Sequence, residues 1–459
     1  MKQNRFLVYI KDMTTEKTIS EFLSNEYKEF SLYVIENRAI PSVIDGLKPV
    51  QRKIIHVSNQ IWKTGSEKEL KVFQLAGKVA SDAFYHHGNQ SLENAIITMA
   101  QDFKNNMPLL HGEGQFGSLR SPEAGAPRYI GAKLHKNFRI LYKDFELLDY
   151  KEEEGEQIEP RFFLPIIPTI LINGSSGIAV GFSSNILNRN IIDVITACES
   201  VLKGKKVNKV NPHIPSFKGA FIEDSENKKR WIIRGSLQIL NTTNVKVTEL
   251  PPSMTLEKYE NILDDLVEKK IIVSYDDNCK DNVDYTIKFT RENLSKYDEE
   301  KLIKLLKLEE YETEIYSTLD ESGRLRIFDN VDDIIKYFVV FRLGYYDKRK
   351  QFMLDKMKHE LKVLSNRGRF IKAIVDGKLE VKNIAKEKII KDIEAMGLDK
   401  IDDSYDYLLR MPIWSLTKEL YEKLKEDFKL KKEEMEKLSL VDPKDMYLED
   451  LQELKKKVK

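Results

Sequence analysis

The 459-residue sequence has only two cysteines, Cys198 and Cys279, and this scarcity excludes both a disulfide framework and a four-thiolate zinc site. It also has no apolar run close to the roughly 20 residues that a membrane-spanning helix needs. The apolar run at residues 6–10 is far too short for a signal peptide. We therefore expect a cytoplasmic protein with no membrane partner.

Charge of one sign is not in excess, because 75 Lys and Arg face 74 Asp and Glu. Any DNA-binding surface must then be a local patch rather than a property of the whole chain. Residues 31–140 hold 14 Lys and Arg against 9 Asp and Glu, whereas residues 141–160 hold 2 against 8. This change predicts a domain boundary near Tyr150.

Common catalytic motifs are missing as well. Gly174-Ser-Ser-Gly177 is not followed by the lysine of a phosphate-binding loop, and there is no Gly-x-Ser-x-Gly elbow. His86 and His87 have no partner at zinc-ligand spacing. The basic region does contain polar side chains that suit phosphodiester chemistry: Arg38, Lys48, Arg52, Lys53, His87, Arg128 and Tyr129.

Apolar periodicity predicts three kinds of region. The first is a small helical domain with a β-hairpin, built from helical patterns and short apolar runs at 26–40, 50–61, 91–103, 129–130 and 138–142. The second is an α/β region, with short strands at 162–186 and a sheet at 217–289 that includes a helix at 256–269.

The third region, beyond Val331, is typical of long amphipathic helices. Leu354, Met357, Leu361 and Leu364 step by three and four, and a second apolar series runs from Leu416 to Leu438. Two such series predict an antiparallel helical pair with a small helical knob between Arg369 and Met411. Periodicity alone fits ordinary core helices equally well.

The dipeptide Arg128-Tyr129 is the candidate centre of the chemistry. A phenol has a pKa near 10, so a tyrosine that attacks phosphorus needs neighbouring cations to stabilise the developing charge. Adjacent residues of a strand point to opposite faces, however. The dipeptide alone therefore fits a surface arginine beside a core tyrosine as well as it fits a nucleophile.

Longer motifs surround this dipeptide: Asn37-Arg-Ala-Ile-Pro41, Asp45-Gly-Leu-Lys-Pro49, Tyr85-His-His-Gly88, Met99-Ala-Gln101, Pro127-Arg-Tyr-Ile130, Asn173-Gly-Ser-Ser-Gly-Ile-Ala-Val-Gly181 and Thr248-Glu-Leu-Pro-Pro252. In these motifs and their order, over about residues 26–455, the sequence closely resembles the breakage-reunion (A-type) subunit of type IIA DNA topoisomerases. Within that family it looks most like the medium subunit of large tailed-phage enzymes, so the cytoplasm would be that of the host.

The resemblance implies an α+β multidomain fold whose parts can be assigned by range. They are an N-terminal arm that contacts a partner (1–30), a winged-helix DNA-gate domain with the active-site tyrosine (31–160), an α/β tower domain (161–332), a first coiled-coil helix (333–370), a helical C-gate knob for dimerisation (371–415), a return coiled-coil helix (416–438) and a C-terminal helix and tail (439–459).

The resemblance also implies a role for each candidate residue. Tyr129 would form a 5′-phosphotyrosyl bond with Arg128 stabilising the transition state, and Arg38 and His87 would approach the scissile phosphate. Ile178, which would otherwise be taken as a buried isoleucine, would wedge between base pairs and bend the DNA. Contacts with the flanking DNA are expected from Lys48, Arg52, Lys53 and Tyr85.

The implied function is DNA cleavage and religation in an ATP-dependent type II DNA topoisomerase, an isomerase. Relaxation or decatenation is expected rather than supercoiling, since the sequence leaves no room for a DNA-wrapping domain. Mg²⁺ and ATP are both expected on a separate large subunit with ATPase and Toprim modules, and no metal or cofactor on this chain. A homodimer joined at the DNA gate and the C-gate would supply one tyrosine per strand. A non-catalytic DNA-bending scaffold and a tyrosine-recombinase-like strand transferase are the alternatives.

Overall fold

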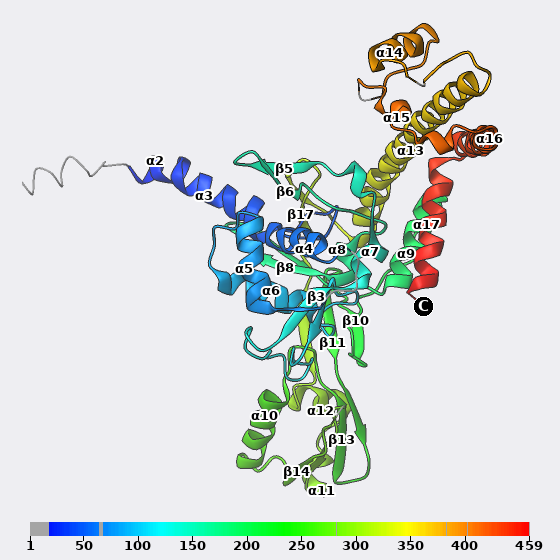
Figure 1. Ribbon diagram of the computed structural model, residues 1–459. Coiled ribbons are helices and arrows are strands. Elements are labelled where there is room, and N and C mark those ends of the chain that lie inside the picture. The colour runs from blue at the N-terminus through cyan, green and yellow to red at the C-terminus, as the bar shows by residue number, and fades with distance from the viewer. Residues whose placement is uncertain (1–17, 64–67, 281, 382, 402, 459) are drawn as a thin grey trace, which may run out of the picture. The chain divides into compact units, whose positions relative to one another are not determined.

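The computed structural model describes residues 18–63, 68–280, 282–381, 383–401 and 403–458 (Figure 1). Two compact units divide the chain. One contains the chain up to Val340 together with the last residues from Leu451, and the other contains Phe341–Asp450. Helices and strands both occur throughout the first unit, which confirms the mixed α/β class. In the described ranges, no helix is both long and apolar enough to cross a membrane.

The first unit begins with a run of helices, of which the last three contact a small sheet. The helices are α2 (Ile19–Ser24), α3 (Glu26–Val34), the π-helical turn η1 (Ile35–Ala39), α4 (Pro49–Ile61), α5 (Val72–Asp82) and α6 (Asn89–Ala100). The antiparallel sheet has the order β1 (Leu70–Lys71), β3 (Gly131–Leu134), β2 (Leu110–Glu113). Ile54, Leu75, Val79 and Ile96 are fully buried, because apolar residues three or four apart lie on one face of each helix.

The short apolar run at 138–142, which suggested part of a β-hairpin, is helical for most of its length. Residues Lys136–Leu141 form helix α7, which begins where the His135 ring accepts a hydrogen bond from the Asn137 backbone N–H. Phe138 and Leu141 are three residues apart and both fully buried, which suits a helix face. Tyr129 is not in a strand either, since it ends a turn before β3.

The segment that follows is built from short elements. They are β4 (Tyr142–Lys143), the 3-10 turn η2 (Phe145–Leu147), β5 (Tyr150–Glu153), β6 (Glu156–Pro160), β7 (Leu164–Pro165), α8 (Thr169–Asn173), β8 (Ser175–Ile178), β9 (Ser183–Ile186) and α9 (Ile191–Leu202). The acidic stretch forms the β5–β6 hairpin, whose β6 strand packs against α4. Helix α8 was not predicted, and its apolar residues are buried on all sides.

Two further sheets complete the strands of this unit. One has the order β10 (Ala220–Glu223), β11 (Arg230–Arg234), β16 (Glu309–Thr313), and β17 (Ser317–Leu319) pairs with β18 (Leu325–Ile327) nearby in sequence. The other has the order β12 (Ser236–Ile239), β13 (Asn244–Glu249), β15 (Tyr285–Lys288), β14 (Ser274–Asp277). We call residues 236–308 the β12–β15 module. Helices α10 (Leu256–Glu268), α11 (Arg291–Leu294) and α12 (Glu299–Leu305) share one apolar core with its sheet.

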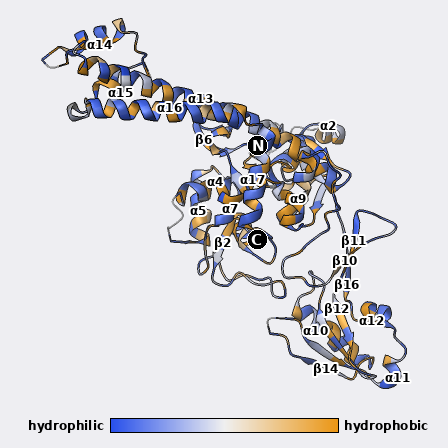
Figure 2. Cartoon of the chain, turned by 90° about the vertical axis from the view of Figure 1, so that its right-hand side faces the viewer, coloured by the Kyte–Doolittle hydropathy of each residue, from blue (hydrophilic) through white to orange (hydrophobic). Residues whose placement is uncertain are grey.

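The second unit is helical. Its elements are most of α13 (Val331–Val375), α14 (Lys386–Ala395), α15 (Asp406–Leu409), the 3-10 turn η3 (Ile413–Ser415), α16 (Lys418–Leu440) and the first half of α17 (Pro443–Lys457). Helices α13 and α16 lie side by side, with hydrophobic and hydrophilic bands alternating along both (Figure 2). An ion pair of 2.7 Å joins Glu360 to Lys431 across them. Helices α14 and α15 pack with the end of α13 around Phe370 and Ile393.

Candidate functional site

Four of the predicted site residues border one pocket of about 740 Å³: Arg38, Lys48, Tyr85 and His87. Arg38 lies on the exposed side of the η1 turn, and His87 lies in the turn that leads into α6. His87 Nε2 is 2.7 Å from the Tyr33 hydroxyl, and the His87 ring packs edge-on against Tyr85. The Tyr85 hydroxyl in turn is 2.6 Å from Ser91 Oγ. These contacts fix the imidazole beside the cations Arg38 and Lys48.

Lys48 also binds the β8–β9 hairpin. Its Nζ donates a hydrogen bond of 2.6 Å to the Ser176 carbonyl, and partial burial lowers the pKa of its ammonium. The residue after Ser176 must be glycine, because a Cβ at Gly177 would overlap the Ala39 carbonyl oxygen. Ile178 follows, and its side chain is 86% exposed. The alternative of a buried core isoleucine is therefore wrong.

Tyr129 lies in a second exposed place, at the end of the turn formed by residues 126–129. Its side chain is 72% exposed, so the alternative of a core tyrosine is also wrong. The Arg128 guanidinium lies 5.6 Å from the centre of the Tyr129 ring, and Lys71 Nζ donates a hydrogen bond of 2.8 Å to the Tyr129 carbonyl. Tyr129 is not among the described residues that line the pocket of Arg38 and His87.

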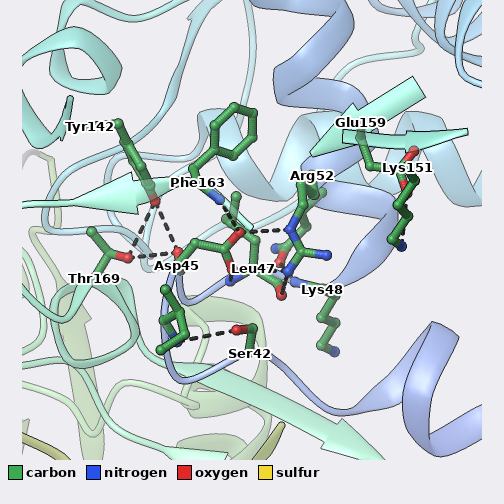
Figure 3. Close-up of polar contacts among 12 residues, drawn as sticks. Ser42, Asp45, Leu47, Lys48, Arg52, Tyr142, Lys151, Glu159, Phe163 and Thr169 are labelled. Atoms are coloured by element: carbon green, nitrogen blue, oxygen red, sulfur yellow. Dashed lines mark hydrogen bonds and ion pairs between the residues drawn. The ribbon is translucent and has the colours of Figure 1, made fainter. Parts of the chain in front are cut away.

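Arg52, which the sequence predicts to contact DNA, is buried in the structure. Its side chain is 5% exposed, and its guanidinium donates to both carboxylate oxygens of Asp45, at 2.7 and 3.0 Å (Figure 3). Asp45 also accepts backbone hydrogen bonds from Leu47 and Phe163. Burial opposes the charge on Arg52, yet the carboxylate of Asp45 holds the pKa of the guanidinium above its usual value.

Lys53, also predicted to contact DNA, is paired with a carboxylate as well. Its Nζ lies 2.8 Å from Glu159 Oε2 and donates a hydrogen bond to the Ala83 carbonyl. The side chain is only 13% exposed, because strand β6, which carries Glu159, lies against α4. Helix α4 therefore turns Arg52 and Lys53 towards the interior, and of these three cations Lys48, just before the helix, lines the pocket.

Three contributors to the site were missed by sequence reasoning: Tyr33, Asp45 and Lys71. Asp45 belongs to the motif at residues 45–49, but its contacts come from distant segments. The Phe163 backbone N–H donates to its carboxylate, and the hydroxyls of Tyr142 and Thr169 donate to its backbone carbonyl (Figure 3). Within the described ranges, no cluster of three or more His, Cys, Asp or Glu could hold a metal ion. The arrangement can supply a phenol, an imidazole and several cations to a phosphodiester.

Comparison with known proteins decides the family. The model for the A subunit of DNA gyrase/topoisomerase IV matches residues 38–453. The chain belongs to this family. It is 35% identical over 444 residues to the DNA topoisomerase medium subunit of Enterobacteria phage T4, and the alignment covers 96% of this chain and 99% of that protein.

Eukaryotic members of the type II topoisomerases align over a smaller share of their length. The chain is 34% identical to the mitochondrial DNA topoisomerase 2 of Dictyostelium discoideum and 33% identical to human DNA topoisomerase 2-alpha, and it spans 35% and 32% of those proteins. Its fold matches the DNA-binding, cleavage and re-ligation domain of Plasmodium falciparum topoisomerase II with a TM-score of 0.83 and 33% identity. That match covers 95% of this chain and 64% of the other.

Family membership confirms the resemblance and the reaction class. The chain is a cleavage and religation subunit of a type II DNA topoisomerase, an isomerase, and these relatives support that reading over the recombinase and scaffold alternatives. Type II topoisomerases use Mg²⁺ and ATP. The roles of single residues do not follow from membership alone.

Proposed function

We propose that Tyr129 is the nucleophile that cuts DNA and becomes joined to its 5′ end. The phenol oxygen attacks the phosphorus, the 3′ oxygen leaves, and religation is the reverse step. The observation that carries this proposal is the exposed phenol beside Arg128 in a turn that is braced by Lys71. Arg128 stabilises the charge that develops on the phosphate oxygens.

A complete site needs more than this turn, since the pocket of Arg38, Lys48 and His87 is lined without Tyr129. We propose that two copies of the chain complete each other's site, so that the partner subunit's Tyr129 approaches this pocket. Cutting both DNA strands requires two tyrosines, and a two-fold symmetric dimer supplies one Tyr129 for each strand. Lys48 and Tyr85 then contact the DNA backbone, and the exposed Ile178 inserts at a base step.

We further propose that Mg²⁺ and ATP bind a separate large subunit with ATPase and Toprim modules. The described residues of this chain do not offer a metal-binding cluster, so no step here is assigned to a metal of its own. The arm proposed for partner contact, of which residues 1–17 lie outside the described ranges, exposes large apolar side chains that suit such a contact: Ile19, Phe22, Leu23, Tyr27 and Phe30.

The finer domain assignments are proposals of the same kind. Helices α4 to α6 with the β1-β3-β2 sheet have the composition of a winged-helix DNA gate. The β12–β15 module would be the core of the tower. In the second unit, α13 and α16 would form the coiled coil, with α14 and α15 as the C-gate knob that dimerises.

A mixed dimer tests whether the site is shared. One copy carries Tyr129→Phe and the other carries Arg38→Ala, each with its own affinity tag, and the large subunit is present. If the site is shared between subunits, the mixed dimer keeps one intact site and cuts one strand. If each site lies within one chain, no intact site remains and the mixed dimer cuts one strand only at the slow rate of Arg38→Ala.

Homodimers of each variant are the controls. Tyr129→Phe should form no protein-linked 5′ ends, and Arg38→Ala should cleave about 10² to 10³ times more slowly, as expected when one preorganised charge is lost. Protein-linked ends from the Tyr129→Phe homodimer would refute Tyr129 as the nucleophile. Single-strand cutting at the slow Arg38→Ala rate in the mixed dimer would refute the shared site.

A further inference from the structure

The Tyr129 turn ends a loop whose two sides approach each other at Phe116 and Pro122, and we call this point the neck. Gln101 Nε2 donates hydrogen bonds to the carbonyls of Phe116 and Pro122, at 2.8 and 3.1 Å. Between these two residues the chain makes a tight turn, and Gly117 adopts a φ of +83° where a Cβ would lie 2.8 Å from Pro122. The neck therefore holds residues 117–121 as a projecting tip.

Arg120 lies in this tip and makes four side-chain hydrogen bonds to the β12–β15 module. Its Nη1 donates to the carbonyls of Pro251 and Met254, at 2.8 and 3.0 Å. Its Nη2 donates to the Leu250 carbonyl at 2.6 Å and to the Glu249 carboxylate. The Arg120 carbonyl in turn accepts from the Leu256 backbone N–H. All of these partners lie at the end of β13, at the start of α10 or in the turn between them.

The acceptor Glu249 is itself fixed in place. Its side chain is 7% exposed, and its carboxylate also accepts from the backbone N–H groups of Leu250 and Lys218, both at 3.0 Å. A Cβ at Gly235 would overlap the Glu249 carbonyl, so strand β12 starts in close contact with this point. Arg120 thus joins the loop to a rigid part of the module. A lysine could not do this, because it lacks the planar fork of donors.

We propose that Arg120 is a positioning residue for the nucleophile, and that it couples the placement of Tyr129 to the β12–β15 module. This inference rests on the proposed role of Tyr129. A chain of contacts carries it: the Arg120 fork fixes the tip, Gln101 fixes the neck, and the Gly125 backbone N–H bonds the Gln115 carbonyl at 2.8 Å just before the Tyr129 turn. In-line attack tolerates little error, since a misplacement of about 1 Å can cost roughly 10² in rate.

A purely structural role makes a different prediction. If Arg120 only attached the module to the loop, its loss would lower the melting temperature and leave the rate of cleavage by folded protein unchanged. A positioning role slows cleavage and religation together, because both steps pass through the same geometry. It leaves DNA affinity unchanged, since the guanidinium is turned towards protein carbonyls and only 14% of the side chain is exposed.

The experiment uses the full chain together with its ATPase-bearing large subunit. It compares Arg120→Ala, Arg120→Lys and Arg230→Ala. Arg230 is the matched control, because it also pairs with a carboxylate, that of Asp224, in the same unit. We expect both Arg120 variants to cleave and religate about 10 to 100 times more slowly at saturating DNA. Their Kd for DNA and its salt dependence should match those of the unchanged protein, and Arg230→Ala should behave as the unchanged protein in every assay.

Arg120→Lys retains the charge and much of the volume, so it keeps the test open if Arg120→Ala does not fold. Wild-type cleavage and religation by folded Arg120→Lys would overturn the positioning role, whatever its melting temperature. Tyr129→Phe, assayed in parallel, separates the two proposals. If it still forms protein-linked ends, the proposed nucleophile fails. If it forms none and Arg120→Lys remains fast, only the positioning role fails.

Discussion

The stretch of residues 38–53 carries two groups of cations that end in opposite environments. Arg38 and Lys48 border the open pocket beside His87. Arg52 is buried and paired with Asp45, and Lys53 is partly buried and paired with Glu159. The contrast shows that basic residues close together in sequence can lie in different environments, because the surrounding fold decides whether a carboxylate lies within reach of each.

The buried pair of Asp45 and Arg52 helps to position the cation Lys48. Asp45 accepts from Arg52 and from two backbone N–H groups, which fixes the loop that precedes α4. Lys48 leaves that loop at a defined point and reaches Ser176 on the β8 strand. The buried ion pair therefore places the cation and the hairpin that carries Ile178. Three substitutions test this division between buried and exposed residues.

The largest expected effect is on stability. Arg52→Ala leaves the Asp45 carboxylate buried without its cation, so we expect the free energy of unfolding to fall by about 3 to 5 kcal/mol. Denaturant unfolding measures this change. At a temperature where the variant is folded, the salt dependence of its DNA binding should match that of the unchanged protein. A stable variant with a shallower salt dependence would show that Arg52 contacts DNA, and it would contradict the division between buried and exposed cations.

A smaller effect is expected at Ile178, and on the DNA rather than on the fold. Because the side chain is 86% exposed, Ile178→Ala should change the free energy of unfolding by no more than about 0.5 kcal/mol. A wedge contributes to unstacking a base step, which costs a few kcal/mol, so the variant should bend DNA less and cleave it more slowly. Energy transfer between dyes at the two DNA ends measures the bend. A normal bend together with a lowered melting temperature would refute the insertion of Ile178 at a base step.

The smallest effect is expected at Lys48. Lys48→Ala removes about one phosphate contact, so the slope of log K against log salt should become shallower by roughly 0.9, with little loss of stability. Titrations of DNA binding at several salt concentrations measure the slope, and Lys48→Arg is the control that retains the charge. An unchanged slope would mean that Lys48 serves only to hold the Ser176 carbonyl.

Motifs and periodicity predicted much of this molecule because they depend on near neighbours. The spacing of Leu354, Met357, Leu361 and Leu364 is enough to predict a helix, and α13 contains all four residues. The ordered motifs around Arg128 and Tyr129 are enough to indicate the family, which was confirmed. The domain ranges and the roles of the single site residues stay predictions.

Tertiary structure alone decided which of these residues face solvent. Arg52 pairs with Asp45, whose carboxylate also accepts from the backbone N–H of the distant Phe163, and Lys53 is partly buried because Glu159 lies across α4. The run at 138–142 became a helix where packing on the core favoured a period of three or four over a period of two. Arg120 meets Glu249 and the Pro251 carbonyl, more than a hundred residues away. The sequence by itself determined the residue types and their local periods, whereas burial and pairing depend on contacts between distant segments that no local pattern contains.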